Sequence, residues 1–132
     1  DLAVLDLIER SGGRIVLDAT ELGERGLPAR FDMGRAAADP LGELVRAYFG
    51  AIPDAFRRPD DRLHQWLRDE LRRRAARGLV LVRQVWCDHW HAQAGRLRDE
   101  IGLPFLDLDV SCPAGASGTL ESRVQAFLEV LQ

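Results

Sequence analysis

Two short apolar runs separated by one amphipathic helix constrain the fold of this chain more than any other feature. Residues 79–85 are a predicted strand, and residues 88–101 follow with apolar positions at helical spacing. The Gly-Leu-Pro segment at 102–104 then breaks the helix, and residues 105–109 form a second predicted strand. A strand, a helix and a strand in this order are typical of a βαβ unit, so we expect a parallel sheet.

Further predicted elements flank this unit. Residues 2–10 have helical spacing, residues 14–18 are predicted to form a short buried strand, and residues 19–39 are predicted to form a long irregular loop. Three more helices are expected over residues 40–50, 60–77 and 120–131. Because the first helix has no strand before it, we expect another strand upstream. Residues 1–132 should thus form a single α/β domain, with an open parallel sheet of three to four strands and flanking helices.

Composition narrows the class of protein. At 132 residues, with 46% hydrophobic and 30% charged residues, the chain has the size of one globular domain. A net charge of -3 argues against nonspecific nucleic-acid binding, and no apolar run is long enough to cross a bilayer. Two cysteines cannot form a disulfide framework, so we expect a cytoplasmic protein without nucleic-acid or membrane partners. The chain starts without methionine inside a predicted helix, which indicates a piece of a longer protein.

The carboxyl ends of the predicted strands should gather the chemically useful residues at one edge of the sheet. In open parallel sheets ligands bind beyond these ends, and three loops leave them here, at residues 18–25, 87–91 and 109–118. The edge would offer a thiol, carboxylates, a guanidinium and a glycine-rich turn at a helix start. The side chains and glycines concerned are Cys87, Asp88, His89, His91, Arg25, Gly115, Ser117, Gly118 and Thr119.

Cys87 is the strongest of these candidates. It ends the first apolar run and precedes a helix whose N-terminus would stabilise a thiolate acting as metal ligand or nucleophile. The alternative is a small buried apolar residue, since free cysteines are among the most buried residue types. Cys87 could also bind zinc with His89 and His91, although that spacing crosses a strand–helix junction and lacks a fourth ligand.

The other candidates also have two interpretations. Asp88 is either an N-cap or an acid, and residues 114–119 either cradle a phosphate or simply begin a helix. Cys112 is either a second ligand or a loop residue. His64 and the arginine-rich residues 68–77 lie on a charged helix, so we expect both to be solvated.

An ordered set of short motifs carries a resemblance to a known family. The motifs are Gly12-Gly13, Gly23-x-Arg25, Asp39-Pro40-Leu41, Ile52-Pro53, Trp86-Cys87-Asp88-His89, Gly102-Leu103-Pro104, Asp107-Leu108-Asp109 and Gly118-Thr119-Leu120 with the segment that follows to Glu129. On these residues the chain resembles the C-terminal domain of the 2-hydroxyacyl-CoA dehydratase and benzoyl-CoA reductase family, which includes the 2-hydroxyglutaryl-CoA dehydratase D-component. The resemblance covers nearly the whole chain.

The resemblance implies a flavodoxin-like domain in a subunit that normally holds a [4Fe-4S] cluster. It also implies a heterodimer with a paralogous subunit and an ATP-dependent iron–sulfur activator, which supplies one electron. The electron would reach an acyl-CoA thioester, whose ketyl radical loses a hydroxyl group as water. Cys87 would be a cluster ligand, while Arg25, Asp88 and the turn that contains Gly115, Ser117, Gly118 and Thr119 would lie at the substrate edge.

Two positions depart from the family's pattern. Relatives often carry a cysteine in the Gly-x-Arg loop and another just after Ile-Pro, where this chain has Glu21 and Asp54. Because iron–sulfur clusters are held overwhelmingly by cysteine, a three-cysteine site within this chain is excluded. Two functions stay open. The chain is part of an iron–sulfur 2-hydroxyacyl-CoA dehydratase or benzoyl-CoA reductase subunit, or it is a cluster-free, non-catalytic partner or ligand-binding relative that keeps only the fold.

Overall fold

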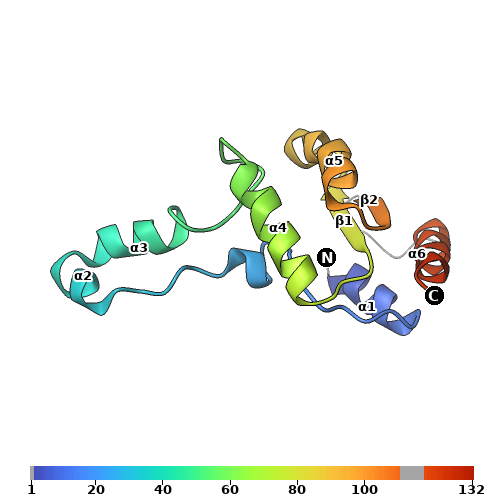
Figure 1. Ribbon diagram of the computed structural model, residues 1–132, viewed down its shortest axis with the longest axis horizontal. Helices are drawn as coiled ribbons and strands as arrows, with labels where there is room; N and C mark the ends of the chain where they lie inside the picture. Colours follow the sequence, from blue (N-terminus) through green and yellow to red (C-terminus); the bar gives the residue numbers. More distant parts are fainter. Residues whose placement is uncertain (1, 111–117) are drawn as a thin grey trace. The chain divides into compact units, whose positions relative to one another are not determined.

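The computed structural model describes residues 2–110 and 118–132, which fall into two compact units. Residues 1–16 with 67–132 make up the sheet unit, and residues 17–66 make up the 17–66 unit. The elements labelled in Figure 1 are α1 (Leu2–Arg10), η1 (Glu24–Gly26), α2 (Met33–Ala38), α3 (Pro40–Tyr48), α4 (Asp61–Arg73), β1 (Leu79–Gln84), α5 (Asp88–Ile101), β2 (Phe105–Val110) and α6 (Gly118–Val130). No helix in the described ranges is both long enough and apolar enough to cross a membrane.

The sheet unit contains the predicted βαβ unit. Strands β1 and β2 pair in parallel, with Leu79 opposite Phe105 and Gln84 opposite Val110, and α5 connects them. Figure 1 shows the two strands side by side, with α5 between them in the chain. Because parallel neighbours require a crossover, the helix predicted over residues 88–101 is what allows this pairing. The prediction of a parallel sheet with flanking helices is confirmed.

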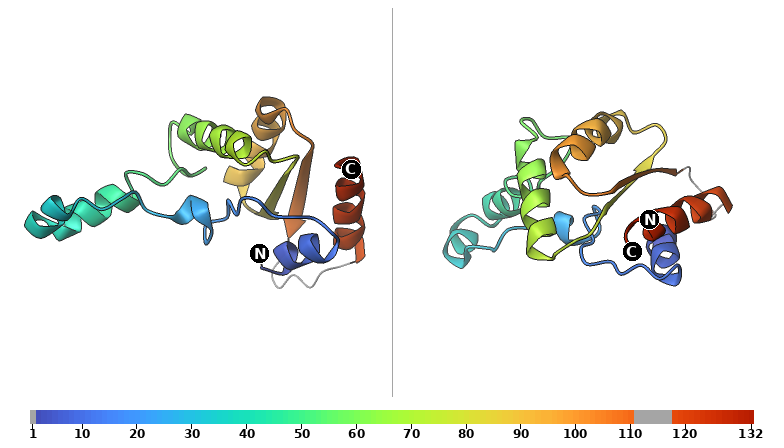
Figure 2. Two further views of the ribbon diagram at one scale, coloured as in Figure 1. Left: turned by 60° about the horizontal axis from the view of Figure 1, so that its bottom comes forward. Right: turned by 45° about the vertical axis from the view of Figure 1, so that its right-hand side comes forward.

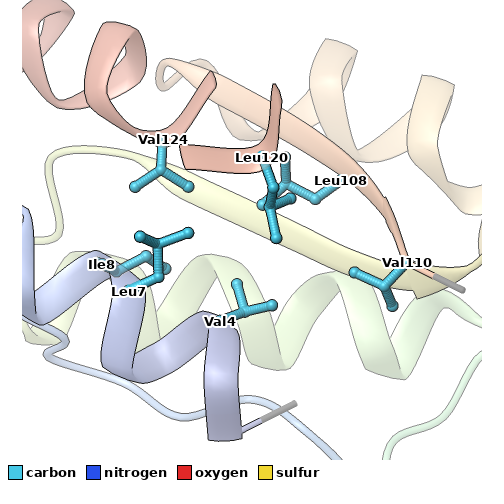
Figure 3. Packing of buried hydrophobic residues seen from close by; sticks show 7 residues of the cluster. All are labelled: Val4, Leu7, Ile8, Leu108, Val110, Leu120 and Val124. Carbon is cyan, nitrogen blue, oxygen red and sulfur yellow. The ribbon is translucent and has the colours of Figure 1, made fainter. Parts of the chain in front are cut away.

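A buried hydrophobic cluster of the sheet unit lies on one face of the two strands. Successive residues of a strand point to opposite faces, so Leu108 and Val110 of β2, two positions apart, share the face that α1 and α6 cover. Figure 2 shows these two helices beside each other, and Figure 3 shows their side chains meeting over the strands. The buried cluster consists of Val4, Leu7, Ile8, Leu108, Val110, Leu120 and Val124. It holds the first and last helices of the chain onto the same sheet face.

Two glycines of the sheet unit allow a sharp turn and a close helix–strand approach. Gly102 follows α5 with a φ of +66°, a left-handed backbone conformation that residues other than glycine rarely adopt. This conformation turns the chain toward β2. A Cβ atom on Gly78 would lie 2.7 Å from the Phe127 ring and 3.0 Å from Leu131. Gly78 therefore lets α6 approach the start of β1 closely.

The expected third strand at residues 14–18 does not form. This segment has no regular secondary structure and is partly exposed, and the Val16 carbonyl accepts a hydrogen bond from the Arg74 guanidinium over 2.7 Å. A strand exists only where its backbone joins a ladder, and here a side chain takes one of the carbonyls instead. The sheet in the described residues thus has two strands, where three to four were expected.

In the 17–66 unit, the prediction of a wholly irregular loop over residues 19–39 is wrong. That stretch contains the short helix η1 and the helix α2, which packs against α3. Asp32 caps α2 by accepting from the Arg35 N–H, and Asp39 caps α3 by accepting from the Gly42 N–H. Each aspartate satisfies an N–H group that a helix start leaves without a partner. Capping, rather than apolar periodicity, marks the first of these helices.

A buried carboxylate fastens α3 to the segment before α2. Glu43 is 3% exposed, and its Oε1 accepts from the Asp32 N–H over 2.6 Å. The Arg46 guanidinium donates to both Glu43 oxygens, over 2.8 and 2.5 Å, and to the Arg30 carbonyl over 2.7 Å. These bonds to the guanidinium, with the Asp32 N–H second, lower the pKa of Glu43 to about 2.

Helix α4 differs from its prediction in length and in one side chain. It ends at Arg73 instead of residue 77, because Ala75 adopts a left-handed φ of +50° and the Ala76 N–H donates back to the Leu71 carbonyl. His64 was expected to be solvated, but it is only 1% exposed. It stands three residues before Leu67 and seven before Leu71, so it shares the buried face of the helix.

The core predicts how a matched pair of valines on α6 should behave. Val124→Ala should lower the free energy of unfolding by about 2 kcal/mol, because two buried methyl groups are lost and a cavity remains. Val130→Ala makes the same chemical change on the same helix at a site that is 71% exposed. It should change stability by less than about 0.5 kcal/mol. Urea unfolding measures both, and equal effects would contradict the packing in Figure 3.

Glu43 predicts an acid transition in the 17–66 unit. Its pKa is about 2 in the folded chain and near its ordinary 4.5 in the unfolded one, so its stabilising effect is complete above about pH 4.5 and disappears as the pH falls toward about 2. The hydrogen-exchange protection factors of residues 29–48, which compare each observed rate with the intrinsic rate at the same pH, should fall through this window. In Glu43→Gln these protection factors should be low already at neutral pH, and they should change little on acidification. Glu9→Gln, an exposed change on α1, should leave the transition in place.

Candidate functional site

Cys87 lies at the junction of β1 and α5, as predicted. Its N–H donates to the Gln84 carbonyl over 3.0 Å, and its carbonyl accepts from the His91 N–H over 2.9 Å. These two bonds fix the turn, and Cys87 is the N-cap residue of α5, although its side chain does not cap the helix. The thiol is free and half-buried. It is therefore not a fully buried core residue.

The residues next to Cys87 do not form a metal site. Asp88 is exposed and is the first residue of α5, not its N-cap, because the Cys87 carbonyl already accepts a helical hydrogen bond from the His91 N–H. His89 and His91 are exposed on the first turn. Residues two positions apart on a helix do not face each other. In the described part of the chain, no group of three or more His, Cys, Asp or Glu residues could hold a metal ion, so zinc binding by Cys87, His89 and His91 is not supported.

A buried ion-pair network lies at the same edge, and the sequence pattern did not single it out. Arg83 of β1 is 7% exposed, and its Nε and Nη2 donate to the two Asp107 oxygens over 2.9 and 3.1 Å. Its Nη1 lies 2.5 Å from an oxygen of Asp109, which is half-exposed. Asp109 stands opposite Arg83 in the parallel register, and Asp107 stands two residues earlier on β2. All three side chains therefore leave the same face of the sheet.

The network determines the charge near Cys87. The hydrogen bonds that Arg83 donates to Asp107 raise the pKa of Arg83 most, and electrostatic interaction with Asp107, Asp109 and Cys87 raises it further. Two carboxylates against one guanidinium leave a net negative charge, so this group of residues is not suited to bind a phosphate. Its sequence signal is Arg83, the one charged residue in an apolar strand, followed by Asp107 and Asp109 at alternate positions of the next strand.

Arg25 is buried in the 17–66 unit. It is 5% exposed, and its guanidinium donates to the Ala19 carbonyl over 2.9 Å and the Pro53 carbonyl over 3.3 Å. It also forms an ion pair with Asp54. Arg25 thus connects its own loop to the segment after Ile52-Pro53. The structure shows it engaged with these protein groups.

The glycine-rich turn is described only in part. Gly118 and Thr119 are exposed residues of the first turn of α6, and the Ser122 hydroxyl donates to the Gly118 carbonyl over 2.9 Å. Gly115, Ser117 and Cys112 lie outside the described residues. The arginine-rich helix end is paired with acids as well as solvated. Arg68 pairs with Glu100, while Arg73 and Arg74 pair with Glu70.

The residues of this chain do not fit a complete [4Fe-4S] site. The sequence has two cysteines, and Cys87 is the one that the structure describes. Glu21 and Asp54 occupy the two positions at which the resemblance led us to note a missing cysteine. Glu21 is exposed, and the Asp54 carboxylate is bonded to Arg25 through one oxygen and to the Phe56 N–H through the other, over 2.9 Å for the latter. Cys87 is the one described residue with the thiolate chemistry that such a cluster requires.

The Arg83 network predicts a specific stability loss. Arg83→Met should lower the free energy of unfolding by about 3 kcal/mol, because it leaves the half-buried Asp107 carboxylate without its cation. Arg73→Met is a matched control, since Arg73 pairs with Glu70 but its side chain is 62% exposed. It should lower stability by at most about 1 kcal/mol. Chemical denaturation compares the two variants, and similar losses would show that the network is not important for stability.

Comparison with known proteins adds the family. The chain matches the family model described as 2-hydroxyglutaryl-CoA dehydratase, D-component, over residues 1–131. No curated protein matches the chain significantly. The resemblance inferred from the ordered motifs is confirmed, and the match includes both the sheet unit and the 17–66 unit. The chain belongs to the 2-hydroxyglutaryl-CoA dehydratase D-component family.

Proposed function

We propose that this chain is part of a subunit of a 2-hydroxyacyl-CoA dehydratase-type enzyme that acts on an acyl-CoA thioester. The family match over residues 1–131 is the observation that carries the proposal. The proposal includes the benzoyl-CoA reductases, because the described residues do not distinguish an enzyme that removes water from one that reduces an aromatic ring. The proposed parent subunit is longer than this chain, and its complete domain has the flavodoxin-like sheet of which β1 and β2 are two strands.

The proposed enzyme works as a heterodimer with a paralogous subunit and receives electrons from an ATP-dependent iron–sulfur activator. A [4Fe-4S] cluster, if the parent subunit holds one, would supply the single-electron chemistry. This chain would contribute Cys87 from the start of α5, and the remaining thiolates would come from outside these 132 residues. The roles left to the chain itself are to fix that thiol through the turn at Gln84 and to set the charge beside it through Arg83.

The second candidate is a cluster-free partner subunit or ligand-binding relative that keeps the fold without the redox chemistry. One observation favours it. Both oxygens of Asp54, at a position where relatives often carry a thiolate, are bonded to protein groups. A carboxylate already bonded in this way is a poor substitute for a soft sulfur ligand. Fold membership alone does not decide between the two candidates.

Iron and acid-labile sulfide analysis of the anaerobically purified parent protein distinguishes them. For the dehydratase candidate we expect iron and sulfide in the wild type, and a loss of at least half in Cys87→Ser, because one thiolate ligand is removed. Cys112→Ser is the matched control, because it changes the other cysteine of the chain, and it should retain the wild-type content. Cluster loss on Cys87→Ser would justify testing acyl-CoA substrates with the partner subunit and activator.

Two results would contradict the proposal that Cys87 is a cluster ligand. Equal iron in the wild type and Cys87→Ser would show that the thiol is not a ligand. Absence of iron and sulfide from both proteins after reconstitution would favour the cluster-free partner. Far-ultraviolet circular dichroism of each variant shows whether a loss of iron reflects a loss of fold.

A further inference from the structure

We propose that an ion pair between Arg25 and Asp54 joins the loop at residues 18–27 to the segment at residues 52–56, and that these two segments bind no metal. Relatives often carry a cysteine at one position in each of these segments, where this chain has Glu21 and Asp54. The proposal does not depend on whether Cys87 holds a cluster in the parent protein. It assigns to this part of the 17–66 unit a salt-bridge clamp, which we call the Arg25–Asp54 clamp.

The first half of the clamp is a buried guanidinium with a fixed direction. Arg25 is 5% exposed, and its Nε donates to the Ala19 carbonyl over 2.9 Å. Its Nη1 donates to the Pro53 carbonyl over 3.3 Å and pairs with Asp54. Arg25 therefore bonds both to its own loop and to residues that lie 28 and 29 positions later in the sequence.

The loop that carries Arg25 is folded around a second acidic residue. The Asp18 carbonyl accepts from the Glu24 N–H over 2.7 Å, and its carboxylate accepts from the Thr20 N–H over 2.9 Å. Gly23 has no room for a side chain, because a Cβ there would lie 2.3 Å from the Asp18 carboxylate. These contacts within the loop hold Arg25 in the position from which it pairs with Asp54.

In the second half of the clamp, both oxygens of the Asp54 carboxylate are already bonded to protein groups. One Asp54 oxygen pairs with Arg25 and the other accepts from the Phe56 N–H over 2.9 Å. The next residue, Ala55, is fully buried, which fixes the backbone between them. A metal ion on Asp54 would have to share an oxygen with one of these bonds and sit beside a guanidinium that carries a permanent positive charge. Arg25 therefore both occupies the carboxylate and repels a cation.

Hydrogen exchange of the full 132-residue chain tests the clamp. In Asp54→Asn the amide exchange of residues 18–27 and 52–57 should become at least about tenfold faster, since removing one partner leaves a buried charge uncompensated and opens the local structure. Glu21→Gln is the matched control, because Glu21 is the exposed residue at the other expected ligand position. It should leave both segments protected. Peptides from β1, β2 and α6 should be unchanged in both variants, which separates local opening from global unfolding.

The Arg25→Lys variant provides a second test of the clamp in case the Asp54→Asn variant does not fold. A lysine retains the positive charge for Asp54 but cannot donate to Ala19, Pro53 and Asp54 in the same planar geometry. It should accelerate exchange in both segments by less than Asp54→Asn does. Wild-type rates in Arg25→Lys, or in a folded Asp54→Asn, would overturn the clamp.

The same chain incubated anaerobically with ferrous iron and sulfide tests the second half of the proposal. Exchange of residues 18–27 and 52–57 should not respond to the metal. Metal-dependent protection of these segments, lost in Asp54→Asn, would overturn it. Iron bound through Cys87 instead would bear on the proposed function and leave these segments unaffected, so failure of one proposal is distinguishable from failure of the other.

Discussion

The parallel pairing of β1 with β2 is the constraint on which the rest of the sheet unit depends. Parallel neighbours need a crossover helix, and α5 supplies it between Cys87 and Gly102. The pairing brings the ends of both strands to one edge, so that Cys87 follows one strand and Asp109 lies near the end of the other. It also forms the apolar face that α1 and α6 cover (Figure 3).

Buried ion pairs organise the places that the apolar core leaves open. Arg83 spans two aspartates on the sheet face opposite the cluster that α1 and α6 cover, Glu43 fastens α3 to the segment before α2, and Arg25 joins two loops through Asp54. Each pair combines charge with hydrogen bonds to defined partners. Such pairs are demanding in geometry, because a misplaced partner leaves a charge without compensation. In this chain they specify which segments meet, while the apolar residues supply the general tendency to associate.

Family membership and ligand chemistry lead to different expectations in this protein. The match over residues 1–131 assigns the chain to a dehydratase family, whereas the described residues offer one thiolate and two carboxylates at the expected ligand positions. A fold can persist after its chemistry has changed, because packing depends on the apolar pattern and a metal site depends on a few exchangeable side chains. The bonded state of Asp54 is a concrete instance, because a position at which relatives often carry a cysteine here joins two loops.

The sequence by itself determined the βαβ unit, the two strands, most helix positions and the place of Cys87 at a strand–helix junction, because these follow from local periodicity and from glycine and proline breaks. It could not decide whether residues 14–18 would be a strand, since that depends on finding a backbone partner, and Arg74 bonds to the Val16 carbonyl instead. The prediction that His64 is solvated was also wrong, because its burial depends on which face of α4 turns inward. The partners of Arg25 and Arg83, and the Asp32 N–H that donates to Glu43, were decided only by the tertiary structure, because these contacts join residues that no helical or strand spacing relates.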